Sequence, residues 1–351
     1  MVTGANKGIG YAVVQALCKQ FDGDVLLTGK ANKVIGYAVV QALCKQFDGD
    51  VLLTGKANKG IGYAVVQALC KQFDGDVLLT GKTNKGIGYA VVQALCKQFD
   101  GDVLLTGRSE ERCKAAVAEL QKQGMSPKYH QMDLDDQTSI NKLRDFVKEQ
   151  YGGIDVLVNN AGIAFKAAST APFSEQATVS CATNFYGTLN VCNTLFPLLR
   201  PHARPHARVS NVSSMASQMS IAKCSNAIKA KFKDPKITMD QLKALIQQFI
   251  DAAQTDSHQK QGFASSAYGM SKVGVTVMSF IQQRELNSDP REDIVVNACC
   301  PGYVDTDMSS HKGPKTIEQG ADTPVYLAML PSGTTSPKGN YLSDRTIKNW
   351  G

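Results

Sequence analysis

The first hundred residues of this 351-residue chain repeat one unit four times, with a period of 26 residues. The unit GYAVVQALCKQFDGDVLLTG begins at Gly10, Gly36, Gly62 and Gly88. Each copy is typical of a helix, a DGD turn, a VLLTG strand and a loop. A strand, a glycine-containing loop and a helix in this order open a doubly wound nucleotide-binding fold. The chain is therefore predicted to be an α/β protein with a Rossmann-type parallel sheet and helices on both faces.

The four copies differ in the loop that would approach a phosphate. Copy one, TGANKGIG, has the usual TGxxxGxG spacing, but only Met1 and Val2 remain of its incoming strand. Copy two carries Val34 in place of the second glycine, which hinders close backbone approach to a ligand. In copies three and four, Lys56 and Lys82 lengthen the loop by one residue. Only copy four continues directly into the rest of the chain.

We predict that copy four, residues 76–107, is the working start of a catalytic domain that spans residues 76–351. The first strand of a doubly wound sheet lies between strands two and four, which leaves no place for additional copies. Residues 1–75 would then be an appendage of duplicated β-α-β units. Copy one, with the intervening units looped out, is the alternative. A protein-interaction array is disfavoured because near-identical copies lack distinct capping ends, and recent duplication or a gene-model error explains them better.

The loop of copy four is the candidate phosphate site. Glycines allow the backbone to approach a pyrophosphate, and the following helix offers free N–H groups. The residues expected to contact a dinucleotide here are Gly81, Asn84, Lys85, Gly86, Ile87 and Gly88. Arg108 ends the second strand, where NAD-binding folds carry an acid. A guanidinium suits a 2′-phosphate, so NADPH is the predicted cofactor.

Two later motifs carry candidate catalytic residues, NVSS at 211–214 and YGMSK at 268–272. Tyr268 and Lys272 are four residues apart, and on a helix they share one face. An ammonium beside a phenol lowers the phenol's pKa, which is ordinarily ~10, and favours proton transfer to a carbonyl oxygen. An isolated YxxxK pair usually marks only a partly exposed helix face. The serine-ended strand and the glycine loop favour the catalytic interpretation.

The chain resembles the short-chain dehydrogenases/reductases, and within them the monomeric NADPH-dependent carbonyl reductases of animals. The resemblance covers residues from about 76 to the end. It rests on NKGIG, DVLLTGR, YGGIDVLVNNAGIAFK, TNFYGT, NVSS, SSAYGMSK, GVTVMS, NACCPGYVDTDM and TPVYLAMLP. It implies NADPH-dependent reduction of quinones, ketones and aldehydes to alcohols. The alternative is a non-catalytic dinucleotide-binding protein whose lengthened loop impairs phosphate binding.

The resemblance also assigns roles to individual residues. Tyr268 would protonate the substrate oxygen, Ser214 would hydrogen-bond it, and Lys272 would tune Tyr268 and hold the nicotinamide ribose. Asn184 of TNFYGT matches the fourth catalytic position, although it could equally mark a structural kink. The further cofactor contacts implied are Asp133, Leu134, Asn160, Gly162, Pro301, Gly302, Val304 and Thr306. The expected substrate walls are Phe165, Met215, Tyr303 and Met308.

An insert separates the serine from the tyrosine. Ser214 and Tyr268 are 54 positions apart, where the family usually has about a dozen. Within the insert, residues 215–262, the run Thr238–Gln254 has one apolar face and is predicted to be a helix. In the monomeric relatives such an insert covers the surface used for oligomerisation, so a monomer is expected. A partner-binding helix is the alternative.

Composition excludes other classes of function. The net charge of +7 is spread out without a basic block, so neither nucleic acid nor a membrane is an expected partner. Four of the ten cysteines are one repeated position, and no cluster has metal-ligand spacing. There is no leader-like segment and no apolar run long enough to span a bilayer. We expect a reduced, cytoplasmic protein that binds a small carbonyl substrate and no metal.

Overall fold

The computed structural model describes residues 2–3, 27–28, 53–54, 77–80, 86–99, 101–166, 168–200 and 207–351. The predictions for Gly81, Asn84 and Lys85 lie outside these residues. The chain divides into two compact units, one of Met1–Phe73 with Gln98–Asp100 and one of Asp74–Lys97 with Gly101–Gly351. In the first unit, β1 (Val2–Thr3), β2 (Leu27–Thr28) and β3 (Leu53–Thr54) form a parallel three-stranded sheet.

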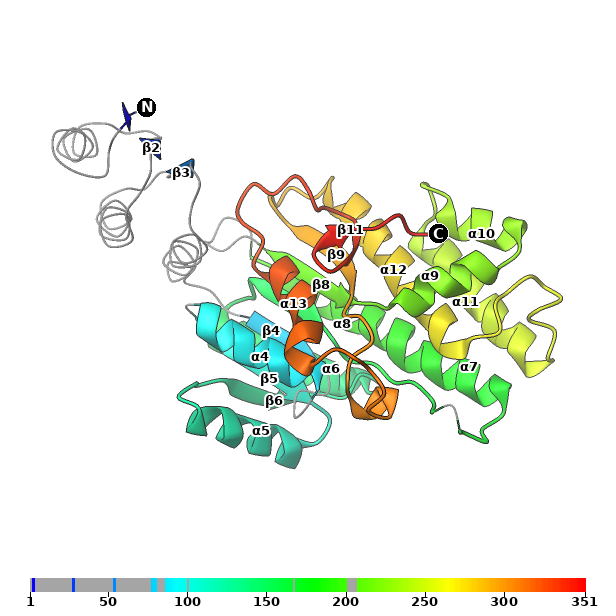
Figure 1. The fold of residues 1–351 in the computed structure, drawn as a ribbon, viewed down its shortest axis with the longest axis horizontal. Coiled ribbons are helices and arrows are strands. Elements are labelled where there is room, and N and C mark those ends of the chain that lie inside the picture. The colour runs from blue at the N-terminus through cyan, green and yellow to red at the C-terminus, as the bar shows by residue number, and fades with distance from the viewer. Residues whose placement is uncertain are drawn as a thin grey trace. The chain divides into compact units, whose positions relative to one another are not determined.

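The second unit is built on an eight-stranded sheet of order β11-β10-β9-β8-β7-β4-β5-β6 (Figure 1). Its strands are β4 (Val77–Thr80), β5 (Val103–Gly107), β6 (Lys128–Gln131), β7 (Val156–Asn159), β8 (Arg208–Val212), β9 (Val295–Cys300), β10 (Tyr341–Ser343) and β11 (Thr346–Ile347). All neighbours are parallel except β10 and β11. Leu78 of β4 lies opposite Leu104 of β5 and Leu157 of β7. The strand of copy four thus occupies the central position between the second and fourth strands.

Helices cover both faces of this sheet, which confirms the predicted fold class (Figure 1). One layer holds α4 (Ile87–Gln98), α5 (Glu110–Lys122) and α13 (Ile317–Ala328). The other holds α6 (Gln137–Tyr151), α7 (Phe173–Cys181), η1 (Ala182–Gly187), α8 (Thr188–Leu195) and α12 (Ala267–Leu286), and η2 (Phe196–Leu198) follows α8. The short helix η3 (Asp307–Ser309) lies between β9 and α13. Side-chain caps at Ser109 and Asp136 begin α5 and α6.

A row of buried polar side chains crosses the carboxyl ends of the central strands. Thr80 Oγ1 donates to Asn159 Oδ1 at 3.1 Å, and Asn159 Nδ2 donates to Asn211 Oδ1 at 2.8 Å. Asn211 Nδ2 in turn donates to Ser279 Oγ of α12 at 2.9 Å. Burying amides is costly unless they are hydrogen-bonded, and this row satisfies them within an otherwise apolar sheet. It fixes the ends of β4, β7 and β8 relative to α12, next to the candidate site.

The chain between Ser214 and Tyr268 folds into three helices, α9 (Met215–Lys223), α10 (Asn226–Lys233) and α11 (Met239–Gln254). The run predicted to be helical is α11, and Thr238 forms its capping box with Gln241. The apolar side chains of α11, including Leu242 and Phe249, are buried in a core shared with α7 and α12. This face of α11 therefore packs on the protein's own domain.

Candidate active site

Lys272 is buried under the carboxyl end of β8. It lies in α12 one turn after Tyr268, and its Nζ donates to the backbone carbonyl of Val212 at 2.8 Å. The same Nζ is 6.0 Å from the centroid of the Tyr268 ring. Burial lowers the pKa of Lys272 to about 8, and the charges of Cys299 and Cys300 oppose this shift. A lysine with this pKa exchanges its proton near neutral pH.

The predicted lowering of the Tyr268 pKa by Lys272 is wrong in this structure. Burial raises the pKa of Tyr268 to about 12, the hydrogen bond with the Ser214 hydroxyl lowers it, and Cys300 raises it. Desolvation dominates because the Lys272 ammonium is directed to the carbonyl of Val212. Tyr268 is therefore a neutral phenol at physiological pH, the form able to donate a proton.

Ser213 and Ser214 directly follow β8 but have different surroundings. Ser214 is half-buried, begins α9 as its N-cap and accepts a hydrogen bond from the Ala216 N–H at 3.1 Å. Ser213 is fully buried, donates to the Lys272 carbonyl at 3.1 Å and lies 2.6 Å from Thr276 Oγ1. Ser214 contributes a hydrogen bond that lowers the pKa of Tyr268, whereas the bonds of Ser213 join it to α12, so Ser213 is the more structural of the two.

Asn184 lies in η1, a turn of π-helix that interrupts the α7–α8 helix. Its Nδ2 donates to the Ile163 carbonyl and to Ser271 Oγ, both at 2.9 Å, and its Oδ1 accepts the Ile163 N–H at 2.7 Å. A Cβ on Gly162 would lie 3.2 Å from this Oδ1 and 3.3 Å from Lys272 Nζ. The π-turn thus directs the Asn184 amide toward Lys272, and π-bulges are frequent at functional sites. Because residue 162 is a glycine, no Cβ stands between Asn184 and Lys272.

The first turn of α4 lies against the segment after β9. Gly86 has φ +73°, a conformation that favours glycine, and a Cβ there would lie 3.5 Å from Thr306 Cγ2. A Cβ on Gly320 would lie 2.6 Å from Val304 Cγ2 and 3.1 Å from Ile87 Cγ1. The segment holding Pro301, Gly302, Val304 and Thr306 therefore flanks the free N–H groups that begin α4.

Four of the residues predicted to contact the cofactor stand at the ends of neighbouring strands. Arg108 directly follows β5 and is exposed, and no described residue pairs with its guanidinium. Asp133 and Leu134 follow β6, where the Asp133 carboxylate accepts the Asp135 N–H at 3.2 Å. Asn160 follows β7, and its N–H donates to the Thr80 carbonyl at 3.1 Å. Parallel strands bring these residues to one edge of the sheet.

Most of the predicted substrate-wall residues are exposed. Met215, Tyr303 and Met308 are 48%, 49% and 45% exposed, and Phe165 is half-buried. Sequence reasoning missed Met219, which is 56% exposed on α9. Its spacing of four residues from Met215 is the signal that could have found it. Exposed apolar side chains of this size often mark a binding surface.

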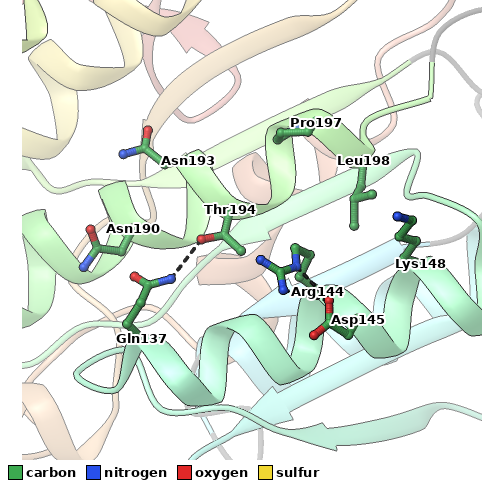
Figure 2. A pocket seen from close by; sticks show the side chains of 9 residues that line it. All are labelled: Gln137, Arg144, Asp145, Lys148, Asn190, Asn193, Thr194, Pro197 and Leu198. Carbon is green, nitrogen blue, oxygen red and sulfur yellow. Dashed lines mark hydrogen bonds and ion pairs between the residues drawn. The ribbon is translucent and has the colours of Figure 1, made fainter.

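Two cavities lie between helices of the second unit. One, of about 640 Å³, lies between α6 and α8. Figure 2 shows the side chains that line it, among them Gln137, whose Nε2 donates to Thr194 Oγ1 at 3.1 Å, and Arg144, which pairs with Asp145. None of the predicted site residues lines it. The second, of about 570 Å³, is lined by Met219, Ser220 and Ser266 among others, and lies where α9 meets the start of α12. Within the described residues no group of histidine, cysteine and acidic side chains could hold a metal.

A nucleotide-binding α/β sheet with tyrosine, serine, lysine and asparagine gathered at the carboxyl ends of its strands defines a dehydrogenase of the short-chain type. The family model for short chain dehydrogenases matches residues 75–232 and 254–316. The chain belongs to this family.

More specific similarity comes from individual relatives. The chain is 49% identical to carbonyl reductase [NADPH] 1 of Bos taurus and of Homo sapiens, over 100% of this chain and 97% of each relative. It is 46% identical to carbonyl reductase [NADPH] 3 of Rattus norvegicus over the same shares. Among solved structures, menthone neomenthol reductase from Mentha piperita is 26% identical, with a TM-score of 0.62 over 76% of this chain and 98% of that one.

Proposed function

We propose that this chain is an NADPH-dependent reductase that converts quinones, ketones and aldehydes to alcohols. The observation that carries the proposal is that Lys272, buried one helical turn after Tyr268 on α12, donates through its Nζ to the Val212 carbonyl, at the end of the strand that leads to Ser214. The likeness to carbonyl reductases over the whole chain supports the same activity. A non-catalytic dinucleotide-binding protein would not need this arrangement, so that alternative is not favoured.

The described residues fit NADPH. Gly86 adopts a conformation that leaves its backbone open to a ligand, and the first turn of α4 offers N–H groups to phosphates. The exposed Arg108 is placed to pair with a 2′-phosphate. With Gly81, Asn84 and Lys85 of the same loop, the holding residues would be Gly86, Ile87, Gly88, Arg108, Asp133, Leu134, Asn160, Gly162, Tyr268, Lys272, Pro301, Gly302, Val304 and Thr306. When bound, NADPH supplies the hydride that reduces the carbonyl carbon.

The chain's own residues handle the proton. Tyr268, neutral at physiological pH, donates its proton to the substrate oxygen, and the Ser214 hydroxyl hydrogen-bonds that oxygen as its charge develops. The resulting phenolate is stabilised by the hydrogen bond from Ser214. The Tyr268 phenolate then regains a proton by way of Lys272, and Asn184, adjacent to Lys272 across Gly162, would anchor the route by which that proton is replaced from solvent.

Apolar carbonyl compounds are the proposed substrates. Phe165, Met215, Tyr303 and Met308, together with Met219, would supply the apolar and polarisable walls of the substrate site. Such walls suit flat hydrophobic molecules such as quinones and aromatic ketones.

We further propose that residues 76–351 form the catalytic domain, that residues 1–75 are a duplicated appendage, and that the protein is a monomer of the cytoplasm. The central position of β4 supports the choice of copy four, and α11 covering α7 and α12 supports the monomer. The seven described cysteines are all free thiols, which suits a reducing compartment. No helix among the described residues is long and apolar enough to cross a membrane.

The proposal is tested by following NADPH oxidation by the full chain with menadione as substrate. Turnover that disappears in a Tyr268→Phe variant with unchanged NADPH affinity supports it. Binding of NADPH without turnover in the wild type would favour the non-catalytic alternative.

A further inference from the structure

The last residues of the chain close over α9, the helix that begins at the candidate catalytic serine. Trp350 is buried and its Nε1–H donates to Ser217 Oγ at 3.0 Å. Gln218 Nε2 donates to the Asn349 carbonyl at 2.8 Å. The Trp350 ring also packs edge-on against Phe280 of α12, with centroids 5.7 Å apart. Residues 349 and 350 are thus joined to the first turn of α9, more than 130 positions earlier in the chain.

Ser217 connects this contact to the catalytic residues. Its side chain is fully buried, and its hydroxyl donates to the Ser214 carbonyl at 2.8 Å. It also lies 3.3 Å from Thr276 Oγ1, which is 2.6 Å from Ser213 Oγ and 3.0 Å from the Lys272 carbonyl. The buried hydroxyls of Ser213, Ser217 and Thr276 therefore link the backbone carbonyls of Ser214 and Lys272. Trp350 donates the hydrogen bond that begins this network.

The donors and acceptors in this network fix the direction of its hydrogen bonds. An indole N–H can only donate, and a serine hydroxyl has one proton. While Trp350 donates to Ser217, the Ser217 proton must point to another acceptor, and the carbonyl of Ser214 receives it. That carbonyl belongs to the residue whose side chain hydrogen-bonds Tyr268.

We propose that Trp350 is a positioning residue for the carbonyl reduction. It orients the Ser217 hydroxyl and so holds the first turn of α9, which sets the direction of the Ser214 hydroxyl toward Tyr268. This inference rests on the proposed function, because it assigns Trp350 a role only if Ser214 acts in the reaction.

The alternative is that the Trp350 ring only fills space. Ser217→Ala separates the two, because it removes the hydroxyl with little change in volume and leaves the ring in place. Trp350→Phe removes the N–H and retains an aromatic ring. Asn349→Ala is the matched control, since the structure uses only the backbone carbonyl of this exposed residue.

The experiment measures kcat and KM with menadione, the affinity for NADPH, and the melting temperature of each variant. We expect Trp350→Phe and Ser217→Ala each to lower kcat several-fold with unchanged NADPH affinity, and Asn349→Ala to behave as wild type. The double variant should be no worse than the poorer single variant, because both changes break one connection. Ser217→Thr, which retains a hydroxyl, should recover part of the lost kcat.

Two results would overturn the proposal. One is a Trp350→Phe or Ser217→Ala protein that melts at a lower temperature yet keeps the wild-type kcat. The other is a double variant in which the two losses in kcat multiply. A Ser214→Ala protein tests the role of Ser214 separately from that of Trp350. If it keeps full turnover, the proposed role of Ser214 fails, whereas its loss of turnover beside a normal Ser217→Ala protein overturns only the role of Trp350.

Discussion

The Nζ of Lys272 donates a hydrogen bond to the carbonyl of Val212, two residues before Ser214. This bond ties α12 to the end of β8 and so sets Tyr268, one turn earlier on α12, beside the serine. It also holds the ammonium in a buried place, where charge is disfavoured and the pKa falls to about 8.

The pH dependence of turnover should report this burial. Because the pKa of Lys272 lies near 8, its ammonium is lost as pH rises through that value, and kcat for carbonyl reduction should fall with it. A Lys272→Met protein should lose ~10²–10⁴-fold in kcat at neutral pH and show no such inflection. Steady-state rates between pH 6 and pH 10 with menadione check this. A wild-type profile that stays level through this range would contradict it.

The pKa of Lys272 also has a consequence for stability. The folded-state pKa lies below the unfolded value, so the unfolded chain binds more protons between about pH 8 and ~10.4, and this residue favours folding increasingly as pH rises there. Lys272→Met should remove that contribution, which urea unfolding of both proteins at several pH values would show.

A second pH-sensitive group lies on the loop after β9. His311 Nδ1 is 2.7 Å from Asp305 Oδ1, and its Nε2 is 3.1 Å from Asp307 Oδ1. Neutral imidazole has one N–H, so only the protonated ring can donate to both carboxylates. These hydrogen bonds raise the pKa of His311, first through Asp305 and then through Asp307.

The expected result is an NMR titration of His311 with a pKa above the ordinary histidine value, lowered toward it in Asp305→Asn and Asp307→Asn. The contribution of His311 to stability is present below the unfolded-state pKa and lost as pH rises through the folded one. A His311 pKa that the two substitutions leave unchanged would show that the bridges do not form in solution.

Arg108 should decide between the two nicotinamide cofactors. It is exposed at the end of β5 without a described partner, and a guanidinium gains charge-assisted hydrogen bonds from a 2′-phosphate. Arg108→Asp should reduce the preference for NADPH over NADH by ~10–100-fold, as expected for the loss of such bonds. Ratios of kcat/KM for the two cofactors measure it, with Lys148→Asp on α6 as the control. An unchanged ratio in Arg108→Asp would remove Arg108 from this role.

The choice of glycine loop can be tested by paired substitutions. Gly86 has a positive φ, so a β-branched residue there is strained even though a Cβ would make only an ordinary contact with Thr306. Gly86→Val should abolish NADPH binding, measured by fluorescence titration, while Gly8→Val in copy one should bind normally. The reverse pattern would assign the phosphate site to copy one.

Much of the fold and of the candidate site could be predicted from the sequence, because the motifs of the short-chain dehydrogenases/reductases are local in the chain. The alternation of strands and helices gave the sheet, and the VLLT strand of copy four could be placed between its neighbours by topology alone. Motif spacing likewise brought Tyr268 and Lys272 onto one face of a helix and placed Ser214 at the end of a strand.

Properties that depend on tertiary surroundings could not be predicted. The raised pKa of Tyr268 follows from burial, which a four-residue spacing does not reveal. The sequence left open whether Asn184 is catalytic or marks a kink, and the structure shows a π-turn there whose asparagine bonds Ile163 and Ser271. The contact of Trp350 with Ser217 joins distant segments and has no local sequence signal.

The most direct test of the central claim is the rate of NADPH oxidation by the full-length protein with menadione, compared with its Tyr268→Phe variant at equal NADPH saturation. The account predicts turnover in the wild type and a loss of ~10²-fold or more in the variant, with NADPH binding retained. Equal rates in the two proteins would contradict the assignment of Tyr268 as the proton donor.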